Sequence, residues 1–287
     1  VGGPQLVAVQ ADEVEIEEST GIFHRHLPPT DEITETPQAD PSAVSIPPEL
    51  DDLLVDDAWP RAAFQERFPG PELRTGNIAR AQAPEQGDFV GSRYQLVRVD
   101  DSDDGEQVVV LTRDGKVQTS EGPRMVRITK RISFPQDRAG LSVHYDVINR
   151  YSDPVVTRFG VELNLNLDGG VGEGRGLVVQ VVDPTQPDGV RSRSISLQAE
   201  ATVKDVVELG WCLDDYGRRV WLAMPIPAEL YIVPIDTVCW SPGGLVRASQ
   251  GHCLLFVWDL ELWGDERKRF DLSLRVEVGA GARAGSV

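Results

Sequence analysis

The feature that most constrains this chain is a long series of strand-like segments that begins at Tyr94 and continues almost to the C-terminus. These segments are rich in β-branched residues and are separated by turn residues, a pattern typical of β-strands. No alternation of strands with helices of the βαβ kind interrupts them, which excludes a (β/α) barrel by pattern. We predict an all-β fold, a large antiparallel β-sandwich. Its strands are expected at residues 94–99, 107–112, 124–134, 141–149, 155–167, 177–182, 194–199, 203–209, 220–224, 230–238, 252–262 and 270–278.

Local patterns add detail to this prediction. Asp114-Gly115 is a dipeptide that favours a type I′ hairpin turn between two strands. Side chains alternate between the two faces of a strand, so Leu141, Val143, Tyr145 and Val147 are expected in the core. If the strands at 141–149 and 155–167 pair as neighbours, their other faces form one polar surface, suited to a hydroxyl-rich ligand or to docking another domain. That predicted surface carries His144, Asp146, Arg158, Glu162, Asn164 and Asn166.

The first 58 residues differ from the rest of the chain. Two strands are predicted at 6–9 and 14–17, and residues 27–58 are rich in Pro, Thr, Asp and Glu, a composition that cannot order itself alone. We expect an extended acidic arm over residues 1–58 and a sandwich domain over residues 59–287, with a short helix at Pro60–Phe68. The first residues, Val1 to Pro4, contain neither an initiator Met nor a signal-peptide pattern. The chain is therefore expected to begin after a processing site or within a longer protein.

Charge and cysteine content exclude several classes of function. The 28 Lys and Arg residues stand against 46 Asp and Glu residues, a formal net charge of −18, which disfavours binding to nucleic acid or to anionic lipid. No apolar run is long enough to span a membrane. Cys212, Cys239 and Cys253 are too scattered for a disulfide framework or a zinc pair, and we expect them to be buried in a reducing compartment. The cytoplasm is favoured, with the periplasm as the alternative if the N-terminus is processed.

Few sequence motifs indicate a catalytic, cofactor or metal site. The glycine-rich segment 169–176 has no GxGxxG register and no following helix, so it predicts a loop and not a dinucleotide site; no cofactor or metal is expected. His24 with His26, and the acidic residues at 51–57, are expected to be solvated. His144 and Glu162 form the one constellation that could perform acid–base chemistry, but a hydrogen-bonded polar patch is the favoured interpretation of these residues. Trp240 precedes a Ser-Pro-Gly-Gly loop and suits a sugar-stacking platform, although core packing also fits.

Several segments, taken in order, resemble a known family. They are 59–68, 126–132, 141–149, 162–165, 234–245 and 250–258, and they are similar to the C-terminal β-sandwich of family 57 glycoside hydrolases of the α-amylase/4-α-glucanotransferase type. The resemblance implies a galactose mutarotase-like supersandwich. In the full enzymes that sandwich is appended to a catalytic barrel that is not found in this chain. Pro242 stands where the family usually has an acidic residue, and no catalytic residue of the family has a matching position here.

The leading hypothesis is a non-catalytic module that binds carbohydrate or acts as a docking or structural subunit of a larger assembly. Its partners would be an α-glucan, held by Glu162, Asn164 and Trp240, or other polypeptides contacted through residues 1–58. One alternative is a part of an amylase or glucanotransferase whose barrel lies outside this chain. The other is a mutarotase-like epimerase with His144 as acid and Glu162 as base.

Overall fold

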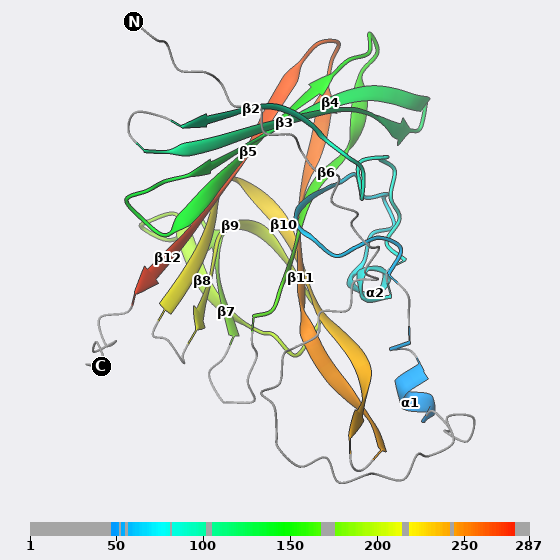
Figure 1. The fold of residues 1–287 in the computed structure, drawn as a ribbon, viewed down its shortest axis with the longest axis vertical. Coiled ribbons are helices and arrows are strands. Elements are labelled where there is room, and N and C mark those ends of the chain that lie inside the picture. Colours follow the sequence, from blue (N-terminus) through cyan, green and yellow to red (C-terminus); the bar gives the residue numbers. More distant parts are fainter. Residues whose placement is uncertain are drawn as a thin grey trace, which may run out of the picture. The chain divides into compact units, whose positions relative to one another are not determined.

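The computed structural model shows one continuous antiparallel sheet that folds into a β-sandwich (Figure 1). It describes residues 47–51, 53–54, 57–80, 82–101, 105–167, 176–213, 218–241 and 244–278, all within the compact unit Asp40–Val287. The elements are α1 (Pro48–Asp51), β1 (Ala63–Arg67), α2 (Thr75–Ala79), β2 (Gln95–Asp101), β3 (Gln107–Thr119), β4 (Gly122–Phe134), β5 (Gly140–Asn149), β6 (Val155–Leu165), β7 (Gly176–Val182), β8 (Val190–Ser196), β9 (Ala201–Leu213), β10 (Arg218–Ser241), β11 (Gly244–Leu262) and β12 (Arg267–Val278).

The strand order is β1-β6-β11-β10-β12-β5-β4-β3-β2, and β9, β7 and β8 branch from β10. The all-β prediction is therefore confirmed. The strands predicted at 220–224 and 230–238 form the single strand β10, which is irregular near Ala228 where it pairs with β9. The predicted strands at 6–9 and 14–17, the arm up to residue 46, both N-terminal histidines and most of the glycine-rich segment lie outside the described residues.

A single large core fills the space between the two layers. As predicted from alternation, Val143, Tyr145 and Val147 of β5 are buried in it, opposite the partly exposed His144. An aromatic cluster lies at its centre, where the rings of Phe159 and Phe270 are 4.9 Å apart. Rings packed edge-on or tilted in this way bury large apolar area without leaving voids. The other members of the cluster are Phe68, Phe89, Tyr145 and Trp258.

The predicted hairpin turn at Asp114-Gly115 is wrong. Strand β3 runs through both residues to Thr119, and the turn lies at 120–121, where Thr119 pairs with Gly122. Gly115 has another reason to lack a side chain: a Cβ atom there would be 2.6 Å from the Phe89 ring. The glycine therefore admits a close contact from the 88–89 loop and does not mark a turn, because tertiary packing overrides the local signal.

The predicted helix at Pro60–Phe68 is also wrong. Residues 63–67 form strand β1, which pairs with β6. Glu66 lies 2.5 Å from Lys130 of β4, whereas Arg67 is ion-paired with Glu162 of β6. Successive side chains of a strand point to opposite faces, so an extended backbone lets both charges find partners. A helix would not place these two adjacent side chains on opposite sides.

The predicted pairing of the strands at 141–149 and 155–167 is wrong as well. Strand β5 pairs with β4 and β12, and β6 pairs with β1 and β11, so three strands of the sheet separate them. The outward face of β10 and β11 is covered by a second apolar cluster, in which α2 and its flanking loops pack on the strands. The outward face of β5 and β12 has no such cover among the described residues. The members of the second cluster are Leu73, Ile78, Ala83, Tyr231, Val233, Cys253, Leu255 and Val257.

The described residues contain no helix that is long and apolar enough to cross a membrane. Of the cysteines, only Cys253 is buried, and burial raises the pKa of its thiol well above the ordinary value. The prediction of burial is wrong for Cys212 and Cys239, which are exposed near the ends of β9 and β10. Both positions are close to a strand end, where the sheet no longer covers them.

Candidate functional site

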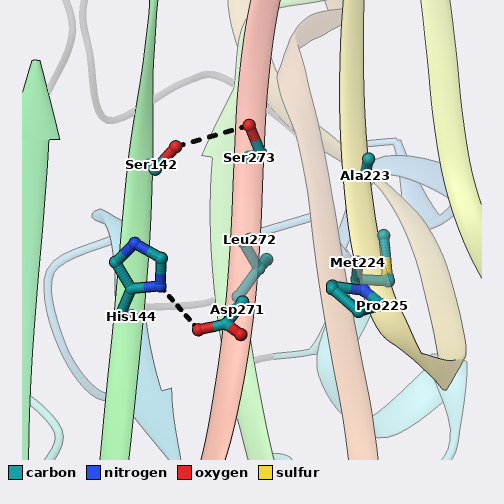
Figure 2. A pocket seen from close by; sticks show the side chains of 8 residues that line it. All are labelled: Ser142, His144, Ala223, Met224, Pro225, Asp271, Leu272 and Ser273. Atoms are coloured by element: carbon teal, nitrogen blue, oxygen red, sulfur yellow. Dashed lines mark hydrogen bonds and ion pairs between the residues drawn. The ribbon is translucent and has the colours of Figure 1, made fainter. Parts of the chain in front are cut away.

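A pocket of about 420 Å³ opens on the outward face of β5, β12 and β10. Figure 2 shows its polar side chains on two neighbouring strands and its aliphatic wall on β10. The residues reach one surface because β5 pairs with β12 in a register that sets His144 opposite Asp271 and Ser142 opposite Ser273. The complete lining is Ser142, His144, Ala223, Met224, Pro225, Asp271, Leu272 and Ser273.

The central contact of the pocket joins His144 and Asp271. The Nδ1 atom of His144 lies 2.6 Å from Oδ1 of Asp271, and because a carboxylate accepts, the imidazole N–H donates. This bond fixes the ring orientation and leaves Nε2 available to a ligand. Both side chains are about one-third exposed. The pair is therefore an oriented imidazole–carboxylate unit that solvent, or a ligand, can reach.

The rest of the lining combines weakly engaged hydroxyls with apolar surface. The Oγ atoms of Ser142 and Ser273 are 3.4 Å apart, longer than a good O–H···O hydrogen bond, so both hydroxyls can bond to another molecule. Ala223 and Pro225 of β10 form the facing apolar wall (Figure 2), whereas the Met224 side chain is only 2% exposed and belongs to the core. Such a lining, apolar on one side with a few placed polar groups on the other, is typical of small-molecule sites.

Glu162 and Asn164 lie elsewhere, under the covered face of β6. The Glu162 side chain is 3% exposed and is ion-paired with the Nη1 atom of Arg67, while its Oε1 accepts a 2.8 Å hydrogen bond from the Asn164 amide. Arg67 also donates from Nε to Glu85 at 2.6 Å and stacks under the Trp59 ring at 4.3 Å. Burial raises the pKa of Glu85 despite the neighbouring Arg67. The structure does not bring Glu162 to His144.

Trp240 lies in a third location. Residues 236–241 of β10 and 244–250 of β11 pair only with each other among the described strands, and they extend beyond the point where β9 and β6 end their pairing. Near the end of β10, Trp240 is 64% exposed, opposite Leu245. This exposure contradicts core packing, the other role that the sequence allowed for Trp240. Trp240 is not among the residues that line the pocket.

The sequence places Ser142 on the same strand face as His144, but it did not predict Asp271, the hydrogen-bond partner of His144, or Ser273, which also lines the pocket. Alternation along β12 does signal the orientation of Asp271 and Ser273, because the residues on either side of Asp271 are buried and place it on the other face. The meeting of β12 with β5 depends on pairing between strands more than 120 residues apart, which no local pattern encodes. Among the described residues there is also no group of three or more His, Cys, Asp or Glu side chains arranged to hold a metal ion.

Comparisons with known proteins agree on the nature of this domain. An α-amylase from Pyrococcus horikoshii is 24% identical over 233 residues, 81% of this chain and 30% of that protein. The crystal structure of the 4-α-glucanotransferase from Thermococcus litoralis matches 80% of this chain and 30% of its own, at 23% identity and a TM-score of 0.57. A galactose mutarotase-like protein from Clostridium acetobutylicum matches 75% of this chain and 79% of its own, with 12% identity and a TM-score of 0.46.

The first two proteins are much longer than this chain, which spans about 30% of each. The family model described as "Alpha-amylase/4-alpha-glucanotransferase, C-terminal" matches residues 22–274, which is most of the chain. The described residues of this range form the antiparallel sandwich reported above. The chain belongs to the family of α-amylase/4-α-glucanotransferase C-terminal domains.

Proposed function

We propose that this chain is a non-catalytic module of an α-glucan-processing protein and that it holds an α-glucan in the pocket of β5, β12 and β10. The observation that carries the proposal is the pocket lining, with an oriented imidazole, a carboxylate and two hydroxyls facing an aliphatic wall. A pyranose ring has hydroxyl groups around its edge and C–H groups on its faces. The hydroxyls match the polar strands, and the C–H face matches Ala223 and Pro225.

The arrangement of carboxylates supports binding more than hydrolysis. Most glycosidases flank the scissile bond with two carboxyl groups, about 5–5.5 Å apart in retaining enzymes and about 6.5–9.5 Å apart in inverting ones. The described lining contains one carboxylate, Asp271, and that group accepts the hydrogen bond of His144. Together with the family, this favours a role in holding glucan for chemistry performed elsewhere.

Titration calorimetry of the purified chain with maltotriose and maltoheptaose tests the proposal. We expect saturable heat, and roughly tenfold weaker binding for His144→Ala, because one hydrogen bond to a sugar is worth about 1–1.5 kcal/mol. Ser273→Ala should weaken binding less. Ser192→Ala on the exposed strand β8 is the matched control and should bind like the parent. No heat at millimolar sugar, or equal binding by all variants, contradicts the proposal.

Docking to another polypeptide is the second candidate. It is favoured by the exposed Trp240 on a hairpin that extends past its neighbouring strands, since a two-stranded ribbon gains stability when it packs on something else. In this case the chain copurifies with another polypeptide from its native source, and Trp240→Ser weakens that association. Trp263→Ser is the control, because Trp263 is similarly exposed but lies after β11, away from the hairpin. Residues 1–58 remain a further candidate contact.

A further inference from the structure

Strand β2 forms one end of the sheet. In the part of the chain that the structure describes, β2 pairs with β3 alone and its other edge has no strand partner. An open edge presents unpaired backbone N–H and C=O groups, which can add another strand. Natural edges are often protected by charges or by short, irregular strands. The side chains of β2 therefore decide whether this edge is protected or used.

Three side chains of β2 are aliphatic and exposed. Leu96 is 57%, Val97 54% and Val99 60% exposed, although apolar side chains of this size are otherwise mostly inside the sandwich. They occupy one short strand and lie on both of its faces. Exposed aliphatic residues clustered on an open edge strand mark an interaction surface, because such an edge can add another strand.

The charges on β2 identify the partner. Arg98 and Asp100 share a face, with Arg98 Nε 3.1 Å from Asp100 Oδ2, and both side chains are about half exposed. If a second copy pairs antiparallel with Val99 opposite Val99, Arg98 of each copy lies opposite Asp100 of the other. Opposite charges directly across an antiparallel pair stabilise it, whereas like charges destabilise it. The charge order is thus self-complementary around a twofold axis.

We propose that two copies of this chain associate edge to edge through β2, in an antiparallel register centred on Val99. The bulge between Leu96 and Arg98 shortens the regular part of the edge. The contact is consequently smaller than a standard permanent interface, and the dimer forms with rising concentration. It is separate from the glucan proposal, because β2 and the pocket strand β5 are separated by β3 and β4.

Sedimentation velocity of the full chain over ~1–100 µM tests the proposal by charge exchange. The parent chain should shift from monomer to dimer. Arg98→Asp and Asp100→Arg should each remain monomeric over that range, because each sets like charges opposite one another. The double variant Arg98→Asp/Asp100→Arg should dimerise again, since it restores both opposed pairs. Arg193→Asp on another edge strand, β8, makes the same charge change as Arg98→Asp and should dimerise like the parent.

A parent chain that stays monomeric at ~100 µM overturns the proposal. The proposal is also overturned if both single variants and the double variant are monomeric. Loss of the dimer without rescue means that the opposed charge pairs are not the contact. Single variants that dimerise like the parent overturn it by placing the interface elsewhere. A circular dichroism spectrum of each variant verifies that the sandwich is intact.

Discussion

Two of the clusters of ionisable side chains on outward faces of the described sandwich differ in what covers them. The His144–Asp271 pair on β5 and β12 is partly open to solvent and lines a pocket. The Arg67–Glu162 pair on β1 and β6 is almost completely buried, with Glu85 and Trp59 packed around it. Both join a carboxylate to a nitrogen donor on a neighbouring strand. Only the first has groups that a ligand can reach.

The contrast means that alternation of polar residues along a strand does not identify a solvent face. A buried charge is tolerated when a partner and hydrogen bonds compensate its lost hydration, which Arg67 does for Glu162. Removing one member then leaves an uncompensated charge. An exposed pair keeps most of its hydration, so its loss costs little. Stability measurements can therefore separate the covered cluster from the open face.

Arg67→Met should destabilise the protein most. This variant leaves Glu162 and Glu85 buried without their cation, and we expect it to lower the free energy of unfolding by about 3–5 kcal/mol in urea denaturation. The control is Arg269→Met on the open face, where Arg269 pairs with Asp146 and is 56% exposed; its cost should stay below about 1 kcal/mol. Equal losses in the two variants would erase the distinction between the clusters.

A smaller loss is expected where a loop covers the sheet at Gly115. The added methyl group of Gly115→Ala collides with the Phe89 ring and the Asp88 carboxylate, and should cost about 1–3 kcal/mol in thermal unfolding. Gly76→Ala in α2 is the matched control, because no atom lies within 4 Å of the position that its methyl group would take. That variant should be neutral or slightly stabilising. A neutral Gly115→Ala would show that the 88–89 loop is not tightly packed on β3.

A third effect depends on pH. His252, buried on β11, is hydrogen-bonded to the Leu197 carbonyl, and burial lowers the pKa of its imidazole below 6.5. The unfolded chain then binds more protons than the folded one between the folded pKa and 6.5. Stability is full above that window and falls as the pH decreases through it, by at most about 1.4 kcal/mol per pH unit. Unfolding of the parent and of His252→Leu from about pH 7 to pH 5 should show this slope only in the parent.

The weakest effect is expected for Asp114, on the outward side of β3. Its two hydrogen bonds to Arg127 hold the pKa of the carboxyl below its ordinary value. Arg127→Met should return that pKa toward the ordinary range in an NMR titration. At a pH above this pKa, the variant should lower the free energy of unfolding by no more than about 1 kcal/mol. The loss disappears as the pH falls and Asp114 becomes protonated. An unchanged pKa would mean that the pair does not persist in solution.

Much of the fold could be predicted from the sequence, because strand signals are local. Alternation placed Val143, Tyr145 and Val147 in the core and His144 on the other face, and β-branched runs located most strands. The errors arose where a residue serves a distant partner. Gly115 accommodates Phe89 rather than a turn, and residues 63–67 are extended because their charges have partners on β4 and β6. The site shows the same limit: His144 was identified, and its partner Asp271 was not.

Short stretches of the chain were enough to specify an antiparallel sandwich, its inward-facing residues and its kinship with α-glucan-processing enzymes, because hydrophobic period and local motifs are properties of short stretches. Which polar faces are open is settled only in three dimensions. Strand order in a sheet depends on pairings between distant segments. Whether a polar face is buried depends on where loops such as those around α2 pack on the sheet. That is why Glu162 is locked in a buried ion pair, whereas His144 faces a pocket with Asp271.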